Sequence, residues 1–100
     1  MVLNHRQVAD AMDEWITSED MSVARVAIIH QLRFKEQTDV ARLFRYCRLQ
    51  AGHPDFFIRK AVGWALRQYA RTAPNIVRDF VEDHRAELSG LSIREATKHL

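Results

Sequence analysis

Residues 56–71 read FFIRKAVGWALRQYAR, and their spacing sets the interpretation of the whole chain. Apolar residues recur every three or four positions, which is the period of an amphipathic helix. The side expected to face a core carries Ile58, Val62, Ala65, Leu66 and Tyr69. At about 100° per residue, the other side forms a narrow arc that we call the basic stripe: Lys60, Trp64, Arg67 and Arg71. The sequence therefore places a tryptophan among cations.

The same helical spacing extends along the chain, which contains only three glycines and two prolines. It predicts an all-α protein with helices at about 5–17, 21–35, 39–50, 55–71, 75–86 and 92–99. Thr38 and Asp55 are predicted N-caps, and Pro74 suits the first turn of the fifth helix. Ser92 and Glu95 have the spacing of a capping box.

A short pattern recurs in alternate helices. It reads ARVA at 24–27, IRKA at 58–61 and IREA at 93–96, which are 34 and then 35 residues apart. The partner helices correspond loosely, so each unit is a helix pair. Helix pairs of this length indicate a HEAT-like α-solenoid, here two pairs flanked by unpaired terminal helices in one domain, residues 1–100.

Both ends of the chain fall within a repeat, so one stacking face of the first helix is expected to lack its neighbour. The apolar residues predicted to be exposed there are Val8, Met12, Trp15 and Ile16. A missing upstream half, a second copy of the chain or another protein could cover them.

Composition excludes several classes of protein. With 47% apolar and 28% charged residues the chain is expected to fold as a globular domain. No apolar run reaches the length of a membrane span, and the first residues lack the pattern of a signal peptide, so we expect a cytoplasmic protein. Cys47 has no cysteine partner, and the five histidines lack ligand spacing, so neither a disulfide, a metal nor another cofactor is expected.

Positive charge is concentrated in the middle of the chain. Residues 33–71 contain nine Lys or Arg but only three acidic residues. This distribution favours an anionic partner on one face, most commonly a phosphate backbone. The alternative is that these arginines only solvate helix faces.

The repeat adds Arg25 and Arg33 to the surface of the basic stripe, because they occupy the positions of Arg59 and Arg67 one unit earlier. Cations there could bind phosphates while the Trp64 indole contacts a base. Alternatively, Trp64 packs into the core and Gly63 makes room for a neighbouring helix.

Two further groups have alternative interpretations. The acidic residues Asp13, Glu14, Glu19 and Asp20 could include a catalytic carboxylate, or could cap and solvate a helix junction, with Asp20 as an N-cap. His30 occupies the repeat position of Trp64 and either faces the same groove or is solvated or hydrogen-bonded.

The stretches HPDFFIRKAVGWALRQYARTAPNIVRDFVEDH (53–84), LSGLSIREATKHL (88–100) and MDEWITSEDMSVARVAIIHQLRFK (12–35) resemble the C-terminal part of the DNA alkylation repair family. Its members are HEAT-like glycosylases that remove cationic N3- or N7-alkylated purines from duplex DNA. The resemblance covers essentially the whole chain, and it favours an exposed Trp64.

The resemblance implies roles for particular residues. Trp64 would be the aromatic that faces the lesion, and Phe56 an aromatic at the groove edge. DNA contacts would come from the basic residues Arg25, Arg33, Lys60, Arg67 and Arg71. The family's catalytic aspartate belongs to a repeat upstream of this sequence and nothing here matches it, so the chain alone is expected to have little or no glycosylase activity.

Overall fold

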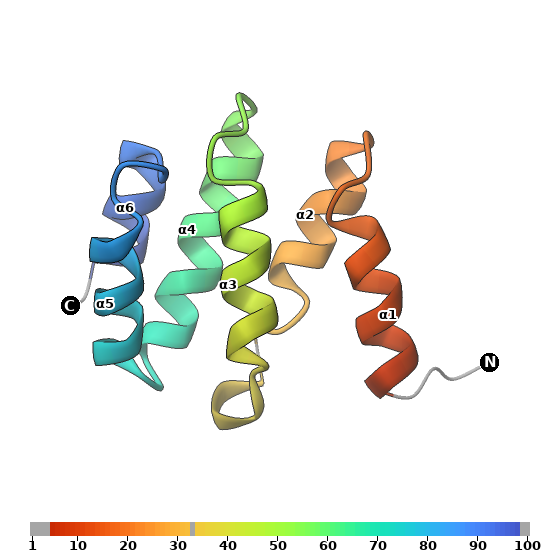
Figure 1. Ribbon diagram of the computed structural model, residues 1–100, viewed down its shortest axis with the longest axis horizontal. Coiled ribbons are helices and arrows are strands. Elements are labelled where there is room, and N and C mark those ends of the chain that lie inside the picture. Colours follow the sequence, from red (N-terminus) through yellow and green to blue (C-terminus); the bar gives the residue numbers. More distant parts are fainter. Residues whose placement is uncertain (1–4, 33, 99–100) are drawn as a thin grey trace.

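A computed structural model describes residues 5–32 and 34–98 and confirms the all-α fold (Figure 1). Within these residues there are six α-helices and one short 3-10 helix, η1. Their bounds are α1 His5–Trp15, α2 Met21–Ile29, η1 Lys35–Gln37, α3 Val40–Leu49, α4 Phe56–Ala70, α5 Pro74–Asp83 and α6 Gly90–Ala96. None of these helices is both long and apolar enough to cross a membrane.

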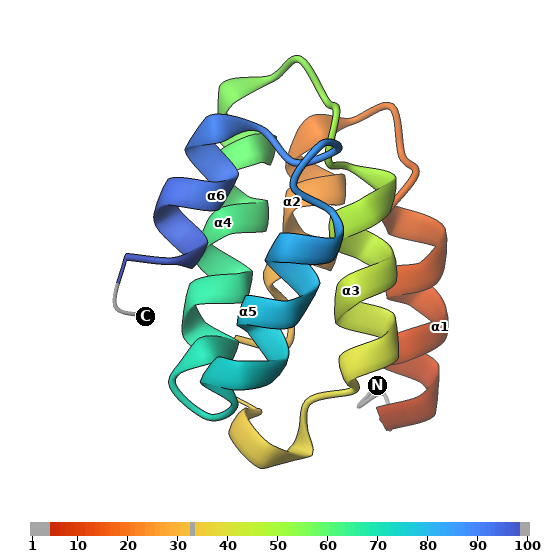
Figure 2. The ribbon, with the colours of Figure 1, turned by 60° about the vertical axis from the view of Figure 1, so that its left-hand side comes forward.

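The helices form two layers, as expected for stacked helix pairs. One layer contains α1, α3 and α5, and the other contains α2, α4 and α6 (Figures 1 and 2). Helix α4 lies in the middle of its layer and packs against α2, α5 and α6. Any function of the basic stripe therefore belongs to the surface of the α2–α4–α6 layer.

Side-chain caps begin most of the helices. Asp20 accepts a hydrogen bond from the Ser22 N–H at 2.9 Å, and Asp55 accepts from the Phe57 N–H at 2.9 Å. Pro74 occupies the first turn of α5, where its missing N–H costs nothing. The predictions for Asp20, Asp55 and Pro74 are confirmed.

Two predicted caps are wrong. The N-cap of α3 is Asp39, whose carboxylate accepts from the Arg42 N–H at 3.1 Å, one residue after Thr38. The N-cap of α6 is Ser89, and its hydroxyl accepts from the Ser92 N–H at 3.0 Å. Ser92 is instead buried inside α6, because its hydroxyl donates to the carbonyl of Arg59 on α4 at 2.8 Å.

Helix α2 ends at Ile29, six residues before the predicted end at position 35. The buried Gln31 side chain explains this difference, because it bonds backbone groups outside the helix. Its Oε1 accepts from the Asp39 N–H at 2.6 Å and its Nε2 donates to the Asp39 carbonyl at 3.2 Å. The connection then turns sharply, and Lys35 takes a positive φ of 50°.

The core lies between the two layers. Its largest fully buried side chains come from all parts of the chain: Ile16, Ile28, Tyr46, Ile58, Val62, Leu66, Val77 and Val81. In the α1–α3–α5 layer, the Phe44 and Phe80 rings stack with centroids 4.1 Å apart. One continuous core therefore joins the repeats.

The predicted apolar patch on α1 is only partly present. Met12 and Ile16 are 6% and 2% exposed, and Val8 is half-buried, because α1 turns this side towards α2 and the core. Trp15 is 41% exposed and is the one member of the four with a large accessible surface. The prediction is therefore wrong for Met12 and Ile16.

Candidate nucleic-acid interface

Helix α4 presents two faces because of the pattern read from its sequence. Its apolar side, including Ile58, Val62 and Leu66, is fully buried. Its first turn is fixed by the Asp55 carboxylate, which accepts from the N–H groups of Phe57 and Ile58 at 2.9 and 3.1 Å. This cap sets the direction in which the aromatic and basic side chains of α4 leave the helix.

An open hollow of about 360 Å³ lies between α2 and α4. We call it the Trp64 hollow, and its lining residues are Arg25, Ile29, Phe57, Lys60, Ala61 and Trp64. The Trp64 side chain is 44% exposed. The structure thus brings together three predicted site residues, Arg25, Lys60 and Trp64, from two successive repeats.

The alternative interpretation of Trp64 as a core residue is wrong, because its neighbour alone performs the packing role. Gly63 is buried where α6 crosses α4. A Cβ added to Gly63 would stand 2.7 Å from the Cβ of Glu95 and 3.0 Å from the carbonyl oxygen of Ser92. Close packing at Gly63 leaves Trp64 on the free surface.

The two phenylalanines at the start of α4 have different surroundings. Phe57 lines the Trp64 hollow, and the Arg25 guanidinium lies 6.0 Å from its ring centroid. Phe56 is exposed outside that lining, with the Lys60 ammonium 5.9 Å from its ring. Sequence reasoning chose Phe56 and missed Phe57, although Phe57 precedes Lys60 by three residues and Trp64 by seven.

The remaining basic residues are spread beyond the hollow. Arg67 points towards α6, where its NH1 lies 3.7 Å from the Glu95 carboxylate. Arg71 is exposed at the C-terminal end of α4 and borders a second hollow. Arg33 lies outside the described residues. Of the four members of the basic stripe, Lys60 and Trp64 line the Trp64 hollow, and Arg67 and Arg71 do not.

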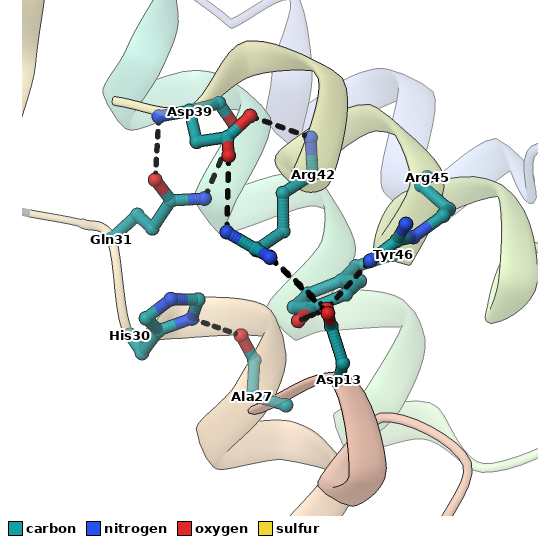
Figure 3. A network of polar contacts seen from close by, with 8 residues as sticks. All are labelled: Asp13, Ala27, His30, Gln31, Asp39, Arg42, Arg45 and Tyr46. Atoms are coloured by element: carbon teal, nitrogen blue, oxygen red, sulfur yellow. Dashed lines mark hydrogen bonds and ion pairs between the residues drawn. The ribbon is translucent and has the colours of Figure 1, made fainter. Parts of the chain in front are cut away.

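The acidic residue Asp13 joins α1 to α3 (Figure 3). Its carboxylate accepts from Arg42 at 3.0 and 3.2 Å, from Arg45 at 2.6 Å, and from the hydroxyl of the buried Tyr46. Arg42 also bonds the Asp39 carboxylate at 3.0 Å. Asp13 does not line the Trp64 hollow, and its contacts hold α1 against α3.

These contacts shift the ionisation of both partners. The Arg42 hydrogen bond holds the pKa of the Asp13 carboxyl well below its ordinary value, with further lowering by Tyr46 and Arg45 and opposition from desolvation. Burial, together with the Asp13 hydrogen bond, raises the pKa of the Tyr46 phenol far above its ordinary value. Asp13 is therefore ionised and Tyr46 protonated at neutral pH.

His30 is a packed residue. Its Nδ1 lies 2.7 Å from the Ala27 carbonyl oxygen, and its ring packs against Phe34 and Tyr46. Desolvation lowers the pKa of the imidazole, which favours the neutral form. The hydrogen-bonded interpretation of His30 is confirmed. Across residues 5–32 and 34–98, no three metal-ligating side chains come together.

Comparison with known proteins identifies a matching family and a similar solved structure. The family described as DNA alkylation repair enzyme matches residues 1–100. Among solved structures, a predicted DNA alkylation repair enzyme from Enterococcus faecalis superposes with a TM-score of 0.88 and 33% sequence identity. The alignment covers 95% of this chain and 44% of that structure, so the chain spans less than half of its length. A search of curated proteins found no match.

Proposed function

Because the chain belongs to the DNA alkylation repair enzyme family, we propose that its α2–α4–α6 face binds duplex DNA as the C-terminal part of a glycosylase for alkylated purines. One observation carries this proposal. The exposed Trp64 ring shares a hollow of about 360 Å³ with two cations, Arg25 and Lys60. Aromatic and cationic side chains in one recess match the base and phosphate parts of a nucleotide.

The two kinds of side chain would contact different parts of the DNA. Arg25 and Lys60 carry the charge that binds phosphate oxygens. The Trp64 ring has an electron-rich face, which attracts a purine that is positively charged through alkylation at N3 or N7. An uncharged base would gain stacking but not this attraction, so the indole supplies a preference for the lesion.

The basic stripe is long enough to follow a duplex. From Lys60 to Arg71 is 11 residues of helix, or about 16 Å along the axis at 1.5 Å per residue. At 3.4 Å per base pair, that length corresponds to about five base pairs. Lesion contact at Trp64 and phosphate contact at Arg71 can therefore belong to one bound DNA.

Base excision needs a group that stabilises positive charge developing on the sugar, and no carboxylate lines the Trp64 hollow in the described part of the chain. The carboxylate beside the adjoining hollow of about 110 Å³ is Asp55, and one of its oxygens already caps α4. Loss of one such stabilising group typically costs about 3–4 kcal/mol of transition-state stabilisation. We therefore propose that this chain alone binds DNA and excises bases slowly at most.

Fluorescence anisotropy with two labelled duplexes, one unmodified and one containing 7-methylguanine, tests the proposal. If Arg25, Lys60 and Arg71 each neutralise a phosphate, the logarithm of the affinity should fall with the logarithm of salt concentration with a slope of about −3. Trp64→Ala should weaken binding of the methylated duplex by about 1–3 kcal/mol and that of the unmodified duplex less.

The matched control is Trp15→Ala, which removes the other exposed tryptophan from a distant helix and should leave both affinities unchanged. Binding that is independent of salt, or an equal loss for both duplexes in Trp64→Ala, would contradict the proposal. A base-release assay on the methylated duplex tests the missing carboxylate separately. Rapid release by this chain alone would show that a group within it supplies the stabilisation.

A second function is favoured by one observation, the 41% exposure of Trp15 on α1. Large exposed aromatics often mark protein contacts, here with further helical repeats or a second copy of the chain. Light scattering that gives twice the chain mass for the wild-type protein, and the mass of one chain for Trp15→Asp, would support this function. A concentration-independent monomer would leave DNA binding as the only proposal.

A further inference from the structure

A second hollow, of about 340 Å³, lies where the connection between α2 and α3 passes the turn between α4 and α5. Figures 1 and 2 show these two connections at the same end of the molecule. We call it the Lys35 hollow. Ile28, Leu43 and Ala65 contribute its apolar lining. Its polar lining includes Lys35, Glu36, Thr38, Tyr69, Arg71 and Thr72.

Among the described residues, these six polar side chains differ from those around Asp13 in having no side-chain partner. Across the described residues, none of them makes a side-chain hydrogen bond or ion pair. Gln31, at the same hollow, shows the contrast, because both ends of its amide bond the backbone of Asp39. Tyr69 is 9% exposed and lines the hollow.

Most of these groups donate hydrogen bonds. Lys35 and Arg71 are cationic donors, and the hydroxyls of Thr38, Tyr69 and Thr72 can each donate a proton. The carbonyls of Gln68 and Tyr69 at the end of α4 already accept backbone N–H bonds. A ligand for this hollow must therefore offer several acceptor oxygens.

The charges around the hollow match those of a monoanion. Lys35 and Arg71 contribute two positive charges and Glu36 one negative charge, which gives a net charge of +1. A phosphodiester carries a single negative charge, whereas a free phosphate or phosphomonoester is largely a dianion at neutral pH. The net charge of +1 balances the single charge of a diester, whereas a dianion would leave one negative charge uncompensated next to Glu36.

We propose that the Lys35 hollow binds one backbone phosphate of a nucleic acid, held by Lys35 and Arg71 with hydroxyl donors around it. Arg71 lies seven residues beyond Trp64, or about 10 Å along α4, so a duplex in the Trp64 hollow reaches this site as well. The choice of DNA as the source of the phosphate rests on the proposed function. The ability to bind a phosphate group rests on the donors alone.

The test is an NMR titration of ¹⁵N-labelled protein with unmodified duplex, followed at the amides of residues 35–38, 68–72 and 60–64. Lys35→Asn removes the charge and keeps a residue that tolerates the positive φ of 50°. Arg78→Gln on α5 is the matched control, because it removes one exposed charge from the other layer. If Lys35→Asn does not fold, Arg71→Gln serves in its place.

All three groups of amides should shift on binding. Lys35→Asn should weaken duplex binding about three- to tenfold and reduce the salt slope by about one, while Arg78→Gln changes neither. The phosphate site is refuted, and the proposed function stands, if the duplex shifts only the amide resonances of residues 60–64 and Lys35→Asn binds the duplex as Arg78→Gln does.

Inorganic phosphate and dimethyl phosphate, used as separate probes, cover the case in which no duplex binds. Shifts at residues 35–38 and 68–72 that Lys35→Asn abolishes would support the phosphate site while the proposed function fails. If neither probe shifts these amide resonances, both the phosphate site and the proposed function are refuted. Glu36→Gln should strengthen binding of inorganic phosphate more than that of dimethyl phosphate, and equal effects would refute the charge argument.

Discussion

Replacing Gly63 by alanine tests how α4 and α6 are held together. The added Cβ would lie 2.7 Å from the Glu95 Cβ and 3.0 and 3.1 Å from the Ser92 carbonyl oxygen and Cα. These atoms belong to the backbone or sit directly on it, so no side-chain rotation relieves the contact. Helix α6 must move away from α4, and the 2.8 Å hydrogen bond from Ser92 to the Arg59 carbonyl is strained.

Two free-energy terms oppose each other in this variant. Alanine is favoured over glycine inside a helix by about 1 kcal/mol. Overpacking a tight contact costs about 1–3 kcal/mol, and the rigid neighbours at Gly63 place it at the upper end. We expect a net loss of about 1–2 kcal/mol in the free energy of unfolding.

Thermal unfolding followed by circular dichroism measures this loss. A change of 1 kcal/mol shifts Tm by about 4–8 °C in a domain of this size, so Tm should fall by about 5–15 °C. Gly52→Ala is the matched control, because nothing lies within 4 Å of its added Cβ and its φ is not positive. In Gly63→Ala, the rate of amide hydrogen exchange should increase most in α6. A Gly63→Ala protein as stable as Gly52→Ala would refute the close contact.

Three further predictions concern single side chains. Asp13→Asn should lower the free energy of unfolding by about 1–2 kcal/mol, a value discounted for the partial exposure of the carboxylate. Because the pKa of Asp13 is lowered in the folded state, this stabilisation is present above the ordinary value of 3.8 and disappears as the pH falls. Urea unfolding curves of the wild-type and Asp13→Asn proteins should therefore converge in acid. Asp55→Ala removes the cap of α4 and should cost about 1 kcal/mol, measured by urea unfolding, whereas Asp55→Ser should restore most of it. Burial raises the pKa of the Cys47 thiol to about 12, so iodoacetamide at neutral pH should label it only on unfolding, and labelling at the rate of a free thiol would contradict its burial.

Sequence alone predicted what depends on neighbours along one helix. The bounds of α4 differ from the prediction by one residue at each end, because Asp55 and the apolar period are both local signals. The end of α2 was wrong because the Gln31 side chain bonds Asp39, eight residues away and beyond a turn. Periodicity contains no information about such a contact.

The candidate site shows the same division. Lys60 and Trp64 were predicted from the spacing of one helix, and Arg25 from the repeat. The Lys35 hollow was missed because its walls come from a connection and from the far end of α4, which meet only after the repeats pack. Phe57 was within reach of sequence reasoning, since its spacing already placed it beside the basic stripe.

The two layers differ in how neighbouring repeats are joined. Between α1 and α3 the joint is built from long side chains, with Asp13 bonded to Arg42, Arg45 and Tyr46. Between α4 and α6 it is backbone against backbone at Gly63. Rotamer changes can lengthen the first joint but not the contact at Gly63. Salt screens the ion pairs of the first joint, whereas in the second it screens the Arg67–Glu95 pair but not the backbone contact. The superhelical pitch of this stack should therefore depend more on ionic strength at its N-terminal end than at its C-terminal end.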